Sequence, residues 1–368
     1  LPAVVGVKGV LGEVKDGELV IMDGETGEIF LEPTEKLVEE YKVKQEKIRV
    51  EKEELKKLIH EEAVTLDGRK VDIWGNIGSP NDVDAVIESG ATGIGLYRTE
   101  FLFMNSDHFP TEEEQYQAYR VVAEKMQGKP VTIRTMDIGG DKELPYLDLP
   151  KEMNPFLGYR AIRISLENKD MFKTQLRAIL RASQYGQIKI MYPMISSINE
   201  IRKANAILEE CKKELDEIGK IYDRNIKVGI MVETPSTAIV AYKFAKEVDF
   251  FSIGTNDLTQ YFLAVDRGNE LVSSLYNSFN PAVLEAIQKV IDAAHHAGIS
   301  VSMCGEFAGD KRATRLLLGM GLDSFSMSAS SGLTIKKIIR NSNYVEAQKY
   351  RDLILKQDTP EDVIEKLK

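Results

Sequence analysis

From residue 70 onward, short apolar runs alternate with longer stretches in which apolar positions recur at helical spacing. The short runs predict buried strands, and the longer stretches predict amphipathic helices. We expect strands at residues 71–76, 92–97, 131–136, 188–193, 227–232, 249–252, 299–303 and 323–326. Eight strands joined by helices predict an α/β fold, a (β/α)₈ barrel of the TIM type, with a doubly wound open sheet as the alternative.

The first 63 residues have a different pattern. Residues 1–33 mix Gly, Val, acidic and turn residues, which predicts short strands and hairpins. Lys and Glu then dominate, and Thr34 is a suitable N-cap for a long helix with a solvated charged face. We therefore divide the chain into a short β-containing remnant at 1–33, a helical linker at 34–63 and the barrel at 64–368.

Composition narrows the class of protein. The 368 residues are 43% hydrophobic and 29% charged with a net charge of −10, and no stripe of Lys and Arg suggests nucleic-acid binding. Apolar runs are too short for a membrane span, and no signal peptide is evident. Two cysteines make no disulfide framework, which favours a reducing cytoplasm. Because the chain starts at Leu1 without Met, we expect a fragment of a longer protein.

Polar residues that a core would not accommodate follow the predicted strands. They are Arg98, Arg134, Glu233, the pair Asn256 and Asp257, and Cys304. The carboxyl ends of barrel strands open on one face, where active sites lie. We therefore expect these side chains to meet in one site.

Glu233 and Asp257 follow neighbouring strands, and two close carboxylates repel each other unless a cation or a proton intervenes. Mg²⁺ is coordinated by one or two carboxylates together with water and substrate oxygens, whereas zinc is disfavoured because no His or Cys stands beside them. The alternative is that Asp257 caps a helix and Glu233 pairs with an arginine.

Cations gather in or beside the same loops. Guanidinium groups suit phosphate and carboxylate, and a strand arginine such as Arg134 needs an anionic partner. Structural ion pairs with Glu233 or Asp137 are the alternative, above all for Arg163 on an apparent helix. Lys142, on a glycine-bearing loop, could close over phosphate or lie in a surface turn. The full set is Arg98, Arg134, Lys142, Arg160, Arg163 and Arg267.

Cys304 is either a proton donor or nucleophile at a strand end or a small buried hydrophobe. Cys211 and the four histidines (His60, His108, His295 and His296) occupy no strand end and receive no role. Neither a phosphate-binding GxxxxGK[ST] loop nor a GxGxxG dinucleotide fingerprint occurs, so ATP or NAD as the main ligand is not supported. The site predicts a small, highly anionic phosphate ester.

Seven long and specific segments stand out between residue 70 and about residue 330. They are Gly93–Met104, Asp137–Tyr146, Asn154–Arg160, Met231–Pro235, Ser252–Gln260, Val265–Asn269 and Cys304–Glu306. In these segments, which cover nearly everything in that range, the chain resembles the C-terminal, phosphoenolpyruvate-binding half of the enzyme I family of the bacterial phosphoenolpyruvate:sugar phosphotransferase system, within the wider phosphoenolpyruvate-utilising enzymes.

The resemblance implies a phosphoenolpyruvate-protein phosphotransferase. Mg²⁺ would lie on Glu233 and Asp257, and Cys304 would protonate the enolate left after phosphoryl loss. Phosphate and carboxylate would be held by Arg98, Arg134, Lys142, Asn256, Asp257 and Arg267, supported by Arg160. The acceptor histidine belongs to an N-terminal phosphohistidine domain whose motif is absent here, and residues 1–33 resemble only the tail of that domain. The carrier protein HPr would therefore be engaged only through the missing domain. The family implies a homodimer, without nucleic acid or membrane insertion.

Three rivals remain open. The chain could come from a dikinase or phosphoenolpyruvate synthase of the same family, which would need an attached nucleotide-binding domain. It could be a lyase that uses a similar Glu/Asp metal pair but no phosphate-binding arginines. It could also act as a non-catalytic dimerisation and ligand-sensing module.

Overall fold

The computed structural model describes residues 4, 6, 7, 9–140, 142, 144–147 and 149–367. The chain divides into two compact units, Leu1–Lys57 and Leu58–Lys368, which are described separately.

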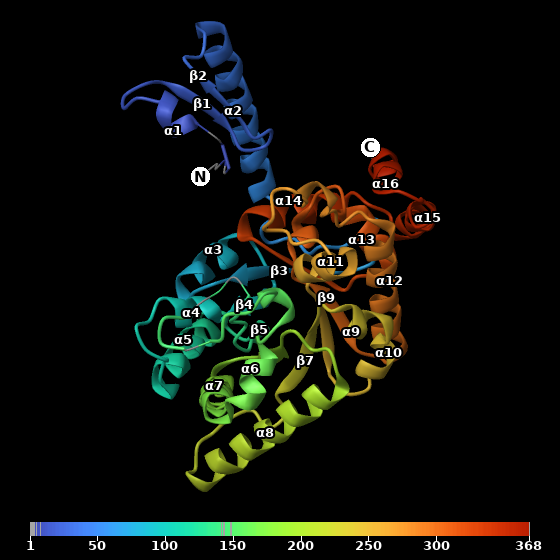
Figure 1. Ribbon diagram of the computed structural model, residues 1–368. Coiled ribbons are helices and arrows are strands. Elements are labelled where there is room, and N and C mark those ends of the chain that lie inside the picture. Colours follow the sequence, from blue (N-terminus) through green and yellow to red (C-terminus); the bar gives the residue numbers. More distant parts are fainter. Residues whose placement is uncertain are drawn as a thin grey trace. The chain divides into compact units, whose positions relative to one another are not determined.

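The second unit is a closed barrel of eight parallel strands in the order β10-β3-β4-β5-β6-β7-β8-β9, ringed by helices (Figure 1). This confirms the predicted (β/α)₈ barrel and excludes the open sheet. The strands are β3 (Asp72–Ile77), β4 (Gly93–Arg98), β5 (Val131–Arg134), β6 (Ile188–Tyr192), β7 (Lys227–Val232), β8 (Phe250–Ile253), β9 (Ser300–Met303) and β10 (Ser324–Met327).

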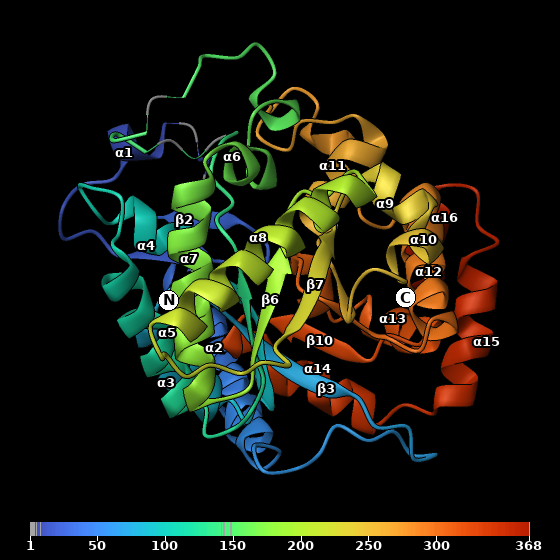
Figure 2. The same cartoon turned by 90° about the horizontal axis from the view of Figure 1, so that it is seen from below.

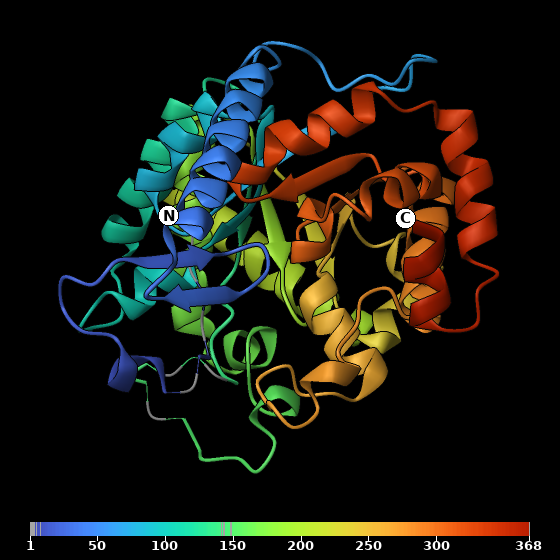
Figure 3. The same ribbon diagram turned by 90° about the horizontal axis from the view of Figure 1, so that it is seen from above.

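Helices fill the intervals between the strands. Figure 2 shows α7 and α8 beside β6 and β7, and Figure 3 shows the red C-terminal helices outside the orange ones. The helices are α3 (Val83–Glu88), α4 (Glu100–Met104), α5 (Glu112–Lys125), α6 (Ile162–Glu167), α7 (Lys169–Ala182), α8 (Ile198–Glu217), α9 (Pro235–Ile239), α10 (Ala241–Phe244), α11 (Thr255–Leu263), α12 (Pro281–His296), α13 (Thr314–Met320), α14 (Ala329–Arg340), α15 (Tyr344–Ile354) and α16 (Pro360–Leu367).

Alternation along the strands divides the apolar residues between two layers. One large cluster packs between the outer faces of the strands and the helices. A small cluster of Leu96, Met191, Met231, Phe250 and Cys304 lies apart from it. Strands buried on both faces are typical of parallel barrels and explain the continuous apolar runs in the sequence.

The first unit holds α1 (Val10–Glu13), the antiparallel hairpin β1 (Val20–Asp23) and β2 (Glu28–Leu31), and the long helix α2 (Glu35–Lys56). The Thr34 side chain accepts a hydrogen bond from the Leu37 amide at 3.3 Å, so the predicted N-cap is confirmed. The helix ends within the expected 34–63 linker. Assignment of residues 1–33 to the tail of a phosphohistidine domain stays a prediction.

Candidate active site

A cavity of about 540 Å³ is formed at the carboxyl ends of the barrel strands. Every residue predicted to bind substrate or metal or to act in catalysis lines it, although these residues come from distant parts of the sequence. They are Arg98, Arg134, Lys142, Arg160, Glu233, Asn256, Asp257, Arg267 and Cys304. Arg163 does not line the cavity, because its Nη1 donates to the carbonyls of Leu157 at 3.0 Å and Gly158 at 2.7 Å.

Arg134 ends β5 and is buried in the cavity wall. Its guanidinium pairs with Glu100 and, through Nη1, with Asp137 Oδ2 at 3.1 Å. Burial acts to lower the pKa of Arg134, but Glu100, Asp137 and Glu233 raise it above its usual range. The structural ion pair with Asp137 is therefore present, and the same guanidinium also faces the cavity.

Asp137 and Glu100 were not predicted as site residues, yet both organise the cations. Asp137 accepts from Arg134, from Arg160 Nη2 at 2.9 Å and from Lys142 Nζ at 3.4 Å. Burial acts to raise the pKa of Asp137, but the three cations hold it well below its usual range. The available signal was position, since Glu100 follows Arg98 by two residues and Asp137 follows Arg134 by three.

Arg160 is fully buried and held on several sides. Its Nη1 donates to Tyr261 Oη at 3.1 Å and lies 3.4 Å from Asp257 Oδ1, while Nη2 pairs with Asp137. The next residue, Ala161, has φ of 51°, a conformation that costs free energy for a residue with a side chain. Arg160 thus links Asp257 and Asp137 and holds both carboxylates in the wall of the cavity.

Glu233 follows β7 and has one satisfied and one unsatisfied oxygen. Oε1 accepts from the Met194 amide at 2.6 Å, and Met194 itself has φ of 54°. Oε2 is buried without a hydrogen-bond partner in the described part of the chain. Burial, then the charges of Asp257 and Asp137, raises the pKa of Glu233 to about 8. This carboxylate does not form the arginine pair considered from the sequence and lacks a neutralising cation.

Arg98 and Arg267 differ from the other cations of the cavity. Neither has an ion pair with any residue that the structure describes, and Arg267 Nη1 is buried without a hydrogen-bond partner. Unpaired guanidinium groups that face a cavity are suited to bind a phosphate or carboxylate.

Lys142 lies on the loop that follows β5. Its Nζ donates to Glu100 Oε1 at 2.9 Å and to the Asp137 carbonyl at 3.2 Å, so the side chain faces the cavity rather than a surface turn. Its neighbours Asp141 and Glu143, part of the motif quoted above, lie outside the described residues.

Cys304 is 2% exposed and packs with Leu96, Met191, Met231 and Phe250. Burial raises the pKa of its thiol; Ser252, Arg134 and Arg98 oppose the shift, and Glu233 adds to it. A side chain at Gly305 would collide with the Thr255 hydroxyl, so Cys304 is followed by a residue that must be small. A protonated thiol in such a place suits a proton donor better than a thiolate nucleophile.

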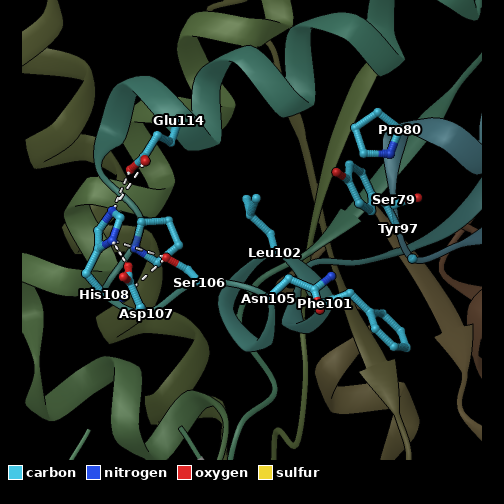
Figure 4. A pocket seen from close by; sticks show the side chains of 12 residues that line it. Ser79, Pro80, Tyr97, Phe101, Leu102, Asn105, Ser106, Asp107, His108 and Glu114 are labelled. Carbon is cyan, nitrogen blue, oxygen red and sulfur yellow. Dashed lines mark hydrogen bonds and ion pairs between the residues drawn. The ribbon is translucent and has the colours of Figure 1, made fainter. Parts of the chain in front are cut away.

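A second cavity of about 660 Å³ lies at the other side of α4 (Figure 4). Its wall includes Tyr97, Leu102 and His108, and His108 Nδ1 lies 2.7 Å from Asp107 Oδ1 while Nε2 faces Glu114 at 3.3 Å. None of the predicted site residues lines this cavity. Charge rather than size therefore distinguishes the candidate active site.

The described ranges of the chain hold no group of three His, Cys, Asp or Glu side chains placed to bind a metal ion. None of their helices combines the length and apolar character that crossing a membrane requires.

Comparison with known proteins shows the family to which the chain belongs. The family of PEP-utilising enzymes, defined by their PEP-binding domain, matches residues 52–344. The chain therefore belongs to the PEP-utilising enzymes, where PEP is phosphoenolpyruvate.

Within that family, the chain is similar to curated proteins named phosphoenolpyruvate-protein phosphotransferase. It is 56% identical to that of Haemophilus influenzae over 363 residues, 54% to that of Bacillus subtilis over 364 and 53% to that of Staphylococcus carnosus over 365. Each alignment covers 99% of this chain but only 63–64% of the relative. The chain thus spans less than two thirds of the length of these relatives.

Among solved structures, one described as a citrate lyase from Burkholderia xenovorans aligns with a TM-score of 0.41 and 16% identity. The alignment covers 68% of this chain and 76% of that one. Similarity at this level carries no argument about activity.

Proposed function

We propose that this chain binds phosphoenolpyruvate with Mg²⁺ at the barrel mouth and supplies the phosphoryl-donating half of a phosphoenolpyruvate-protein phosphotransferase. The observation that carries the proposal is a single cavity with two unpaired guanidinium groups and a buried carboxylate oxygen without a partner. Such a cavity is complementary to a small, multiply charged anion bound together with a cation.

The residues present fit a divalent cation. Glu233 Oε2 is buried without a hydrogen-bond partner among the described residues, and burial with the nearby Asp257 and Asp137 raises the pKa of Glu233, which disfavours its anionic form. Asp257 lines the same cavity, and two carboxylates completed by water and substrate oxygens are what Mg²⁺ prefers. When bound there, the cation would offset negative charge on the substrate phosphate.

The cations divide into two groups with different tasks. Arg98 and Arg267 would contact the substrate anions first, because neither is engaged by a carboxylate in the described residues. Arg134, Arg160 and Lys142 are held by Glu100, Asp137 and Asp257, which fixes their positions before substrate arrives. Asn256 would add an amide donor. Phosphoryl transfer depends mainly on positioning and charge stabilisation, which this arrangement supplies.

Cys304 would complete the reaction after the phosphoryl group has left. The enolate of pyruvate uses the electron pair of its C=C bond to form a new C–H bond at C3, while the S–H bond of Cys304 breaks and leaves a thiolate. In reverse, the thiolate removes a proton from the methyl group of pyruvate. The buried, protonated thiol supports this role as a general acid.

The wider activity is proposed by analogy with the longer relatives. The phosphoryl group would pass to a histidine outside this chain as the first step of sugar phosphotransfer, and HPr would be reached through that part alone. The protein would be cytoplasmic, and two copies of the chain would form a homodimer, which sedimentation at several concentrations would test.

Calorimetric titration of phosphoenolpyruvate, with and without Mg²⁺, tests the binding step. We expect binding that requires Mg²⁺ and that weakens by about tenfold or more in Arg267→Ala, since a charge-assisted hydrogen bond is lost. Arg202→Ala is the matched control, because Arg202 pairs with Glu247 on the outer surface, away from the cavity. Binding that ignores Mg²⁺, or that Arg202→Ala weakens as much as Arg267→Ala does, would contradict the proposed site.

A further inference from the structure

The strand register is interrupted beside the site, at Gly95. Trp74 and Gly75 of β3 pair with Gly93 and Ile94 of β4, but Asn76 pairs with Leu96, so Gly95 is an extra residue in β4. The ladder between β4 and β5 shifts over the same stretch, between Ile94 and Tyr97. Such bulges redirect side chains and occur often next to active sites.

The bulge makes room for a hydroxyl group. A side chain at Gly95 would collide with Ser326 Oγ of β10, so the absence of a Cβ lets this hydroxyl lie against β4. Ser326 Oγ donates to Asn76 Oδ1 at 2.6 Å and lies 3.2 Å from the Gly75 carbonyl. The strands β3, β4 and β10 therefore meet at this hydroxyl group, which bonds to β3 and lies against Gly95 of β4.

The other end of the Asn76 amide reaches Cys304. Asn76 Nδ2 donates to the Cys304 carbonyl at 3.0 Å and lies 3.4 Å from the Ser326 carbonyl. The orientation of the amide follows from its neighbours, because carbonyl oxygens only accept and the nitrogen must face them. Asn76 does not line the cavity, so it touches Cys304 without touching the substrate site.

We propose that Asn76, oriented by the Ser326 hydroxyl, is a positioning residue that fixes the backbone of Cys304 and thereby aims its thiol at the reacting carbon. The inference rests on the proposed role of Cys304 as proton donor. The Cys304 amide is already held by the Ile253 carbonyl at 3.1 Å. With Asn76 on its carbonyl, both peptide groups of Cys304 are anchored, although the next residue is the conformationally free Gly305.

The geometry explains why such an anchor would matter. Cys304 lies just beyond the end of β9, and the bond from its amide to the Ile253 carbonyl is the last that joins this segment to β8. The sulfur makes a long contact of 3.8 Å with the Ile253 carbonyl, and the Ser252 hydroxyl and apolar side chains lie around it. These contacts hold the sulfur weakly, so its direction depends mainly on the backbone. A displacement of a catalytic group by about 1 Å can slow a reaction by about a hundredfold.

The test measures exchange of the C3 protons of pyruvate in D₂O by NMR, with Mg²⁺ present, for the whole chain. Asn76→Asp keeps the acceptor for Ser326 but replaces the donor that faces the Cys304 carbonyl. We expect its maximal exchange rate to fall by about 10- to 100-fold while KM for pyruvate and calorimetric affinity for phosphoenolpyruvate stay unchanged. Cys304→Ala, which keeps binding and loses exchange, sets the lower limit.

Two further variants separate positioning from a general structural effect. Ser326→Ala leaves the Asn76 donor in place and removes only its orienting hydroxyl, so a smaller loss, below about tenfold, is expected. Ser302→Ala is the matched control, since its hydroxyl lies in the same barrel interior and contacts only the Phe251 carbonyl at 3.4 Å. This variant should exchange at the parent rate. Ser326→Ala also tests the inference if Asn76→Asp fails to fold.

The outcomes separate failure of the proposed function from failure of the positioning role of Asn76. No phosphoenolpyruvate binding and no exchange in the parent chain would overturn the proposed function. Normal binding and exchange in the parent, with unchanged exchange in Asn76→Asp and Ser326→Ala, would overturn the positioning role alone. A rise in KM without a fall in the maximal rate would also overturn it, because that pattern indicates altered binding.

Discussion

Glu233 is a buried carboxyl group of the candidate site whose pKa is raised. Its side chain is 1% exposed, one oxygen has no partner among the described residues, and its pKa is raised to about 8 by burial and by Asp257 and Asp137. Without a divalent cation, the folded chain therefore keeps a proton on Glu233 that the unfolded chain loses near pH 4.5. The negative charge of ionised Glu233 is stable in the folded chain only when a cation lies beside it.

A pH dependence of stability follows from this carboxyl group. Between pH 4.5 and 8 the folded state binds the extra proton, so its stabilising effect is complete below pH 4.5 and disappears as pH rises through 8. In the absence of Mg²⁺, we expect the free energy of unfolding to fall by on the order of a few kcal/mol across this range. Urea unfolding at pH 5, 6.5 and 8 measures it.

Glu233→Gln is the matched control for this prediction, because the amide keeps the shape and carries no titratable proton. The variant should have a flatter profile and exceed the parent in stability at pH 8 without Mg²⁺. Added Mg²⁺ should restore the parent at pH 8 and leave the variant unchanged. Parallel profiles for the two chains, with or without Mg²⁺, would show that Glu233 does not carry the effect.

At the scale of residues, the sequence predicted which residues line the cavity better than it predicted which side chains contact one another. The polar residues that follow apolar strands all line the cavity, because the carboxyl ends of barrel strands must meet; they are Arg98, Arg134, Glu233, Asn256, Asp257 and Cys304. The pairing of Arg134 with Glu100 and the contact of Asn76 with Cys304 could not be predicted. The first depends on side-chain conformation, and the second depends on a bulge that no pattern of apolar residues reveals.

At the scale of elements, most strands lie within about one residue of their predicted positions, since period and turn residues define buried strands well. The third barrel strand is shorter than predicted and ends at Arg134 instead of residue 136. There the Met136 amide donates to the Gln175 side chain at 2.9 Å, outside the ladder. Because Gln175 is 39 residues away in the sequence, the pattern of residues around Met136 does not predict this hydrogen bond.

Two helical glycines should respond in opposite ways to the same substitution. Gly319 of α13 faces α15, where a Cβ would collide with the Ala347 carbonyl, a backbone atom that cannot move alone. Gly332 of α14 has the space for a methyl group, with Ile73 Cγ2 at an ordinary 3.4 Å. Gly319→Ala should destabilise by about 1–3 kcal/mol, whereas Gly332→Ala should stabilise by about 0.5–1 kcal/mol.

Thermal unfolding of the two variants beside the parent measures this difference. Helix propensity favours Ala at both positions. A difference in sign between the two variants would therefore come from the close approach of α13 and α15 at Gly319. If both variants were stabilised, α15 would have to move away from α13 at little cost, contrary to the close packing described here.

At the scale of the whole molecule, everything needed for the candidate site lies in the second unit. The residues that line the cavity all fall between Leu96 and Glu306, and the second unit begins at Leu58. The first unit has little interior of its own. In its described part, only Asp23 and Leu55 are buried, and its hairpin has two short strands. Such a hairpin is marginally stable in water, and small units bury too little surface to fold firmly.

Removing residues 1–57 should therefore leave both folding and binding of the barrel intact. We expect a single cooperative unfolding transition and an affinity for phosphoenolpyruvate within about twofold of the parent, measured by circular dichroism and calorimetry. The separate 1–57 peptide should show weak helicity that melts without a cooperative transition, because the i,i+3 ion pairs of α2, such as Glu46–Arg49, add only a few tenths of a kcal/mol each. A truncated barrel that binds more than about tenfold more weakly would mean that the first unit contributes to the site directly. Unchanged binding with a lower unfolding temperature would confine its contribution to stability.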